Sequence, residues 1–260
     1  MCLILVGIDP RPGNRVLLLA NRDEFHARAS APAGPWVEDS AVVGGRDLVA
    51  GGSWLAVRGD GRFAAVTNVR NGPPKPAPRS RGDLVRDYVL GNETTAQFLA
   101  RLQPQIALFA PFNLLLGDGA GVVAFDGTTQ QARPLGAGLH TLSNGPLTAP
   151  WPKMQRLEQL TADVLADGAG PDALLALLRD RQPAPDEQLP QTGFDQARER
   201  MLSPIFTHAN GYGTRASTVV EIADDGQIDL IEVGFDPDAT PADEVHWCFR
   251  PRGKTWSRAA

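Results

Sequence analysis

The chain has 260 residues, of which 42% are hydrophobic, and its 25 basic and 30 acidic side chains give a net charge of −5. This composition supports a packed core and excludes a globally disordered chain. The negative charge argues against a general nucleic-acid-binding protein, which usually has a basic surface. No apolar run approaches the roughly 18 residues of a membrane span, and the N-terminus lacks signal-peptide features, so we expect a cytoplasmic protein.

The first part of the chain is predicted to be rich in β-strands. Apolar runs at residues 2–8 and 16–20 flank a turn-forming segment, which predicts a β-hairpin. Both runs are apolar on both faces, so we expect both strands to be covered on two sides. Shorter strands are predicted at 41–43, 54–57 and 63–67, followed by a proline-rich loop at 71–78.

Helices and strands follow in turn. Ser80–Asp83 has the pattern of a capping box, and the apolar residues after it recur at helical spacing. A second helix is expected around residues 98–102. Apolar residues on one face predict further helices that begin at Pro152 and Pro171. The remaining strands are predicted at 112–116, 122–125, 139–142, 214–222, 228–233 and 245–249, with a polar loop at 181–192.

The order of these elements does not alternate strictly between strand and helix. A doubly wound parallel sheet is therefore disfavoured, and antiparallel sheets covered by helices, an α+β fold, suit the order better. No repeat and no linker divides the chain. We interpret residues 1–260 as one domain.

Cys2 is the first candidate for chemistry. Removal of Met1 would make Cys2 the N-terminal residue, whose free α-amino group titrates near about 7.7–8.0 and can act as a base toward its own thiol. The alternative is a small residue buried at the start of a strand. The other cysteine, Cys248, lies near the opposite end of the sequence, and two cysteines do not form a disulfide framework.

The four polar residues Asn21–Glu24 directly follow the second apolar run, and hairpin pairing places them beside Cys2. On a strand, Arg22 and Glu24 point to one face and the other two residues point to the opposite face. Their charges could hold a carboxylate or an amide of a ligand. The alternative is a solvated loop with a run of charges.

Other polar residues lie at the ends of predicted strands. Asn68 and Asn144 could donate hydrogen bonds to an oxyanion or could simply form turns. Arg70 and Arg215 lie beside strands, where arginine forms surface ion pairs more often than it binds substrate.

No metal site is predicted. The chain has no CxxC, HExxH or EF-hand pattern, and no two histidines have the spacing of metal ligands. Any one histidine could be an axial ligand to haem iron or a hydrogen-bonded structural residue. The four histidines are His26, His140, His208 and His246.

Cys2 and the tetrapeptide Asn21–Glu24 begin a series of motifs that extends to about Val220. The others are Gly44–Asp47, Ala50–Leu55, Thr67–Arg70, Ser80–Gly82, Asn113–Leu115, Leu142–Asn144, Pro150–Lys153 and Tyr212–Thr218. This ordered set resembles the NRDE family, also called the transport and Golgi organisation protein 2 family. That family is similar to N-terminal-nucleophile hydrolases, which implies an αββα four-layer sandwich of two antiparallel sheets flanked by helices.

The resemblance extends to penicillin V acylases and choloylglycine hydrolases, in which an N-terminal cysteine attacks an amide. Those hydrolases space an arginine and an aspartate so that both face the cysteine. Here the two residues are adjacent, so either the strand ends at Asn21 or only one of them serves catalysis. By motif position, the resemblance implies Cys2 as nucleophile, Arg22 and Asp23 as its flanking pair, Asn68 and Asn144 as oxyanion donors, and Arg215 as the late arginine.

The family is also associated with intracellular haem trafficking and with acyl-CoA or lipid metabolism. We therefore expect a protein that binds and delivers haem, or a related amphipathic anion such as acyl-CoA, and that requires no other cofactor. The alternatives are a Cys2-dependent hydrolase of non-peptide amides and a scaffolding protein with a vestigial site. The oligomeric state stays open. Further residues expected to bind the ligand are Asn21, Glu24, Arg70, Trp54 and Trp151.

Overall fold

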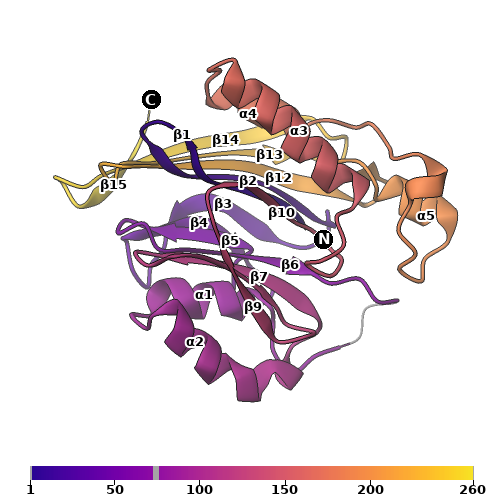
Figure 1. Cartoon of the computed structure of the whole chain (residues 1–260), viewed down its shortest axis with the longest axis horizontal. Helices are drawn as coiled ribbons and strands as arrows, with labels where there is room; N and C mark the ends of the chain where they lie inside the picture. Colours follow the sequence, from indigo (N-terminus) through magenta and orange to yellow (C-terminus); the bar gives the residue numbers. More distant parts are fainter. Residues whose placement is uncertain (1, 73–75, 260) are drawn as a thin grey trace.

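The computed structural model describes residues 2–72 and 76–259 and shows four layers (Figure 1). Two antiparallel sheets lie face to face in the middle, with one hydrophobic core between them. A layer of helices covers the outer face of each sheet, through a separate hydrophobic cluster on each side. The predicted α+β class and the αββα sandwich are therefore confirmed.

The larger sheet has eight strands in the described part of the chain. They are β1 (Cys2–Arg11), β2 (Asn14–Phe25), β10 (Gly138–Leu142), β11 (His208–Ala209), β12 (Tyr212–Ala223), β13 (Ile228–Phe235), β14 (Pro241–Arg250) and β15 (Thr255–Arg258). Their order across the sheet is β10-β1-β2-β12-β13-β14-β15, and β11 pairs with β12. The predicted hairpin is confirmed, but β2 continues to Phe25, so Asn21–Glu24 are strand residues and not a loop.

The smaller sheet has seven strands among the described residues, and each strand pairs with the next along the chain. They are β3 (Ser30–Pro35), β4 (Val42–Asp47), β5 (Leu55–Arg58), β6 (Phe63–Asn68), β7 (Phe112–Asp118), β8 (Gly121–Asp126) and β9 (Gln131–Leu135). The sequence patterns missed β3 and β9. Both lie at an edge of the sheet and are largely exposed or half-buried, so neither shows an apolar run.

The helices form the outer layers. They are α1 (Gly82–Leu90), α2 (Thr95–Leu102), α3 (Pro152–Ala166), α4 (Pro171–Leu177) and α5 (Gln196–Met201), with short 3-10 turns at Gln103–Leu108 and Asp186–Gln188. Helices α1 and α2 cover the smaller sheet, and α3 and α4 cover the larger one (Figure 1). The predicted capping box at Ser80–Asp83 is wrong, because no side chain caps α1. A capping box does begin α2, from Thr94 and Gln97.

Side-chain alternation in β1 and β2 decides which residues face the middle of the sandwich. Ile4 and Leu18 lie in the core between the sheets. Leu5 and Leu19 instead pack in the cluster under the outer helices. Successive strand residues point to opposite faces, so this alternation also orients the polar residues at the end of β2.

Three further expectations concern the whole chain. No helix of the described residues is long and apolar enough to cross a membrane. Cys2 and Cys248 are both free. The predicted proline-rich loop at 71–78 falls partly outside the described residues. The single domain and the cytoplasmic location stay predictions.

Candidate functional site

A cavity of about 420 Å³ opens where the end of β2 meets the smaller sheet. It is lined by Cys2, Arg22, Asp23, Glu24, Arg28, Asp47, Ala50, Ser53, Trp54, Val66, Asn68, Ala77, Arg79, Ser80, Arg81, Gly82 and Ala110. A second cavity of about 570 Å³ shares five lining residues with the first: Glu24, Arg28, Asn68, Arg81 and Ala110. We call the two connected cavities the Cys2 cleft.

Arg22 faces the cleft from the inner side of β2. Its Cα is paired with that of Cys2 across the β1–β2 ladder, so both side chains lie on the inner face. The Arg22 guanidinium lies 4.3 Å from the centroid of the Trp54 ring, and its Nη1 donates to Ser30 Oγ at 3.3 Å. Arg22 forms no ion pair within the described chain. The aromatic ring thus holds a largely buried cation beside Cys2, with no carboxylate of the described residues at ion-pair distance.

Asn21 lies on the opposite face of β2. Its Nδ2 donates to the carbonyls of Leu178 at 2.8 Å and Ile205 at 2.9 Å, and its Oδ1 accepts from Ser217 Oγ at 2.6 Å. Asn21 lines neither cavity of the cleft. The structure therefore does not bring Asn21 into the cleft: the side chain joins β2 to the α3–α4 side of the molecule, and its expected role in ligand binding stays a prediction.

Asp23 also starts from the outer face, although it reaches the wall of the first cavity. Its Oδ1 accepts from Thr214 Oγ1 at 2.7 Å. Burial raises the pKa of the Asp23 carboxyl, and the nearby Lys153 charge opposes this rise. Lys153 is itself buried, and burial lowers its pKa to about 8 although Asp23 favours the charged ammonium. Sequence reasoning missed Lys153, which lies in the Pro150–Lys153 motif.

The Cys2 thiol is half-buried at the start of β1. Burial raises its pKa, and the Asp23 carboxylate adds to the rise. The charge of Arg22 and a backbone hydrogen bond from Asp23 act in the opposite direction but do not prevail. The group that faces the cleft at neutral pH is therefore a thiol and not a thiolate.

The two predicted oxyanion donors have different positions. Asn68 ends β6, is half-buried and lines both cavities. Asn144 is fully buried and lines neither cavity. Its Nδ2 donates to the Asn68 carbonyl at 2.9 Å. The structure thus brings Asn68 into the cleft and places Asn144 behind it as a support for the Asn68 backbone.

Arg70 lies between the cleft and a neighbouring cavity. It lines the second cavity of the cleft, and its Nη1 forms a buried ion pair with Glu199 Oε2 at 3.1 Å. Its guanidinium also lies 4.3 Å from the centroid of the Trp151 ring. Trp151 lines an adjoining cavity of about 490 Å³, which shares Arg70, Asn71 and Gly72 with the second cavity of the cleft. Trp151 thus lies beside the Cys2 cleft, and its expected role in ligand binding stays a prediction.

Arg215 is held away from the cleft by the turn after β2. Its Nη1 donates to the carbonyls of Phe25 at 3.1 Å, His26 at 3.3 Å and Arg28 at 2.9 Å. Arg215 is the extra residue at a register shift in β12, between Thr214, which is paired with Asp23, and Ala216, which is paired with Arg22, and it lines neither cavity. The structure therefore does not bring Arg215 into the cleft: its side chain holds the segment Phe25–Arg28, and its expected catalytic role stays a prediction.

Four further arginines in the cleft were not singled out from the sequence. Arg79 is paired with Asp87, whose Oδ2 lies 2.8 Å from Nη2. Arg28 is neutralised by Asp47, whose Oδ2 lies 2.7 Å from Nη2. Arg81 donates to the Pro111 carbonyl at 3.1 Å and forms no ion pair with any described residue. Arg198 lies 4.1 Å from the centroid of the Phe194 ring and is likewise without an ion pair in the described ranges. Arg81 could have been found from the Ser80–Gly82 motif, whereas no motif marks Arg198.

Comparison with known proteins agrees with the family suggested by the motifs. The Transport and Golgi organisation 2 family matches residues 1–237. A Transport and Golgi organization 2 homolog from Mus musculus is 29% identical over 89% of this chain and 92% of its own length. The homolog from Bos taurus is 30% identical over 91% and 95%, and the Drosophila melanogaster protein is 28% identical over 91% and 94%.

Among solved structures, the mutant C2A conjugated bile acid hydrolase from Clostridium perfringens matches with a TM-score of 0.47 and 10% identity. The match covers 100% of this chain and 97% of that one. The family match spans most of the sequence, and the curated relatives are covered almost completely. The chain belongs to the Transport and Golgi organisation 2 family.

Proposed function

We propose that the protein binds and delivers an amphipathic anion, either haem or a related molecule such as acyl-CoA, in the Cys2 cleft. One observation carries the proposal: Arg22, Arg81 and Arg198 border a partly apolar cleft without an acidic partner among the described residues. A cleft of this kind can bind acidic groups at one place and an apolar body at another.

The unpaired arginines supply the anion-binding part. A guanidinium presents a rigid fork of donors that matches a carboxylate or a phosphate. Burial lowers the pKa of Arg81, although Cys2 and Glu24 favour its charged form, so the cation is partly desolvated. Attraction to a ligand anion is stronger there than in bulk water. Arg28 and Arg70 contribute less because Asp47 and Glu199 already compensate their charges.

The second cavity supplies the apolar part. Its volume of about 570 Å³ is in the range of sites for small organic ligands. Phe25 is 56% exposed beside it, which is unusual for a large aromatic side chain and leaves a ring surface for a ligand. Its apolar lining comes from Phe25, Val69, Ala110, Pro111, Phe194, Met201, Leu202 and Ala209.

Titration with haem tests the proposal. We expect a saturable Soret shift whose apparent Kd rises about tenfold in Arg22→Ala or Arg81→Ala, because each removes a charge-assisted hydrogen bond. Glu24→Gln should instead tighten binding, because it removes a negative charge from the same cleft. Arg101→Ala, which alters an exposed arginine on α2 paired with Glu93, is the matched control.

Competition by acyl-CoA during the same titration would distinguish the two ligand classes. If acyl-CoA displaces haem, both use the cleft. If wild-type protein shows no saturable shift and no acyl-CoA binding, or if the two cleft arginine variants bind as wild type does, the proposal is wrong.

A Cys2-dependent amide hydrolase is the second candidate, and a specific observation favours it. Cys2 and Asn68 line the same cavity, which supports a site with a thiol nucleophile and an amide that donates to the oxyanion. The raised pKa of Cys2 means that a base must remove its proton, and a free α-amino group on Cys2 would be that base. Intact-mass measurement shows whether Met1 is removed. Turnover of acyl amides that is lost in Cys2→Ala would support this candidate, whereas retention of Met1 would exclude the amine mechanism.

A further inference from the structure

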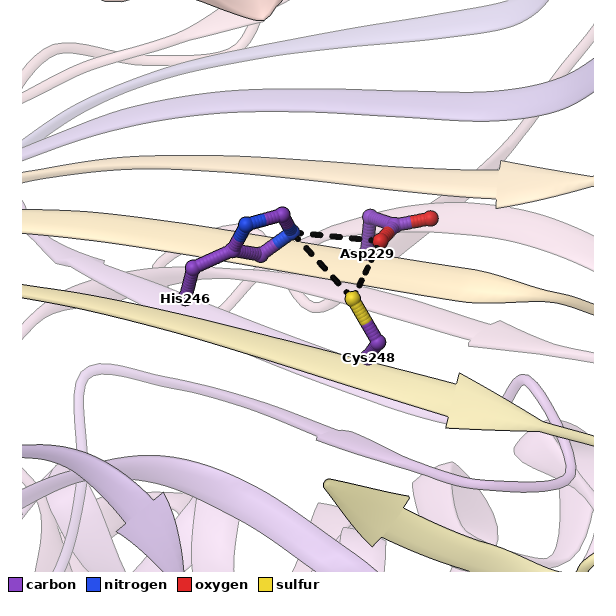
Figure 2. Close-up of side chains that lie close together, drawn as sticks. All are labelled: Asp229, His246 and Cys248. Carbon is purple, nitrogen blue, oxygen red and sulfur yellow. Dashed lines mark hydrogen bonds and ion pairs between the residues drawn. The ribbon is translucent and has the colours of Figure 1, made fainter. Parts of the chain in front are cut away.

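A second cluster of reactive side chains lies on the outer face of the larger sheet, opposite the face that borders the Cys2 cleft. Asp229 on β13 is paired by register with Cys248 on β14, and His246 is two residues from Cys248 on the same strand (Figure 2). Leu230 and Phe249, the chain neighbours of Asp229 and Cys248, lie in the core between the sheets. Alternation therefore points the three polar side chains outward together.

The three side chains turn one donor atom each toward a common point. Cys248 Sγ lies 2.7 Å from Asp229 Oδ1 and 3.3 Å from His246 Nε2. His246 Nε2 lies 3.1 Å from Asp229 Oδ1. A catalytic relay would use the two imidazole nitrogens for different partners. Here the thiol and the carboxylate both meet Nε2, so the arrangement is a convergent set of ligand atoms.

Neighbouring groups fix the orientation of the carboxylate. Gln227 Nε2 donates to Asp229 Oδ2 at 2.7 Å, and Arg250 Nη1 lies 3.7 Å from the same oxygen. Both hold Oδ2 from outside and leave Oδ1 aimed at the sulfur and the imidazole. Outer contacts of this kind are typical of groups that orient metal ligands.

We propose that Asp229, His246 and Cys248 bind a divalent cation of the zinc class, with a fourth coordination position open to solvent. Sulfur, imidazole nitrogen and a carboxylate oxygen form a donor set that suits Zn²⁺, and a thiolate with a carboxylate balances its two charges. The side chains of Asp229 and His246 are 26% and 35% exposed, so a cation can enter and keep a water ligand.

Two conditions must be met for binding. Tetrahedral ligation implies donor separations of about 3.4–3.6 Å, so the sulfur and the carboxylate oxygen must move apart by less than about 1 Å. The thiol must also lose its proton. The cation therefore replaces the thiol proton, the metal–sulfur bond forms, and one proton is released to solvent.

Titration with Co²⁺ alone tests the proposal, because cobalt bound to a thiolate gives a near-ultraviolet charge-transfer band. The full chain carrying Cys2→Ser is the parent protein, so that Cys248 is its only thiol. We expect a saturable band that Zn²⁺ removes by displacement. Cys248→Ser in this parent should abolish the band, whereas His140→Gln, which alters a half-buried histidine on β10, should leave it unchanged.

Gln227→Ala keeps all three ligands and tests the outer contact. It should raise the apparent Kd for Co²⁺ by about 10–100-fold, as loss of an orienting partner does in known metal sites. His246→Gln supplies an independent ligand variant if Cys248→Ser fails to fold by circular dichroism. The proposal is wrong if the parent gives no saturable band, or if the band survives in the folded ligand variants.

Discussion

At the end of β2, the polar residues on the two faces of the strand make different kinds of contact. On the outer face, Asn21 uses its amide on two backbone carbonyls and a serine hydroxyl, and Asp23 accepts from Thr214. On the inner face, Arg22 stacks on Trp54 and, like Glu24, lines the cleft without an ion pair in the described chain. Four consecutive residues thus divide into an outer pair that bonds to buried polar groups and an inner pair that faces the cleft, because a strand has a period of two. Asp23 also reaches the wall of the first cavity.

The largest expected difference between the two faces is in their contribution to the free energy of unfolding. Asn21→Ala should lower the free energy of unfolding by about 3–4 kcal/mol, because it leaves the Leu178 and Ile205 carbonyls and the Ser217 hydroxyl unpaired in the interior. Glu24→Ala is the inner-face control and should change it by less than about 1 kcal/mol, since Glu24 is half-buried and, among the described residues, its side chain bonds only to the Phe25 amide. Urea unfolding measures both values. If both variants lose the same free energy of unfolding, the proposed difference between the two faces is wrong.

Lys153, near Asp23 on the outer face, should make the free energy of unfolding depend on pH. Its pKa is 10.5 in a free side chain and about 8 in the fold, so between these values the unfolded chain binds more protons. The free energy of unfolding therefore rises with pH across this window, by up to about 3 kcal/mol. Lys153→Met lacks this contribution, so the difference between wild type and variant should grow from pH 8 to pH 10.5. A constant difference in urea unfolding would contradict the assignment, and the exposed Lys254→Met is the control.

The smallest expected effect is on the thiol itself. In a Cys248→Ser background, the pH midpoint of Cys2 alkylation should fall in Asp23→Asn, because the carboxylate raises the pKa of this thiol. It should rise in Arg22→Ala, because the guanidinium lowers that pKa. Each shift should be at most about one pH unit. The comparison uses the pH midpoint of alkylation and not its rate, because truncation of Arg22 also changes the access of the reagent to Cys2. Shifts of the same sign would show that the two neighbours do not act through charge.

Local patterns predicted the elements whose signals are complete within a short stretch. The N-terminal hairpin has apolar runs on both sides of a turn, and Pro152 begins α3 as expected. The helix α5 was missed because it is short and polar, and β15 was missed because it is an exposed edge strand of four residues. Their folding depends on neighbours that a local window does not contain.

In the candidate site, too, local patterns predicted some contacts, and others depend on the tertiary structure. Cys2 and Arg22 were expected to meet, because hairpin pairing follows from the sequence. Arg215 was expected in the cleft. It lies instead at a register shift in β12, and its guanidinium donates to a backbone carbonyl of the turn after β2. The His246–Cys248 pair is visible as alternate residues of one strand, yet only the β13–β14 register brings Asp229 to it.

The sequence by itself determined the family, the α+β class and the alternation that sends Arg22 and Asp23 to opposite faces. The tertiary structure alone decided which cations are compensated. Arg70 is paired with Glu199 across 129 positions of chain, whereas Arg22 and Arg81 have no acidic partner among the described residues. The reason is that ion pairing needs proximity of a few ångströms, and the packing of sheets and helices creates that proximity between segments that no local pattern connects.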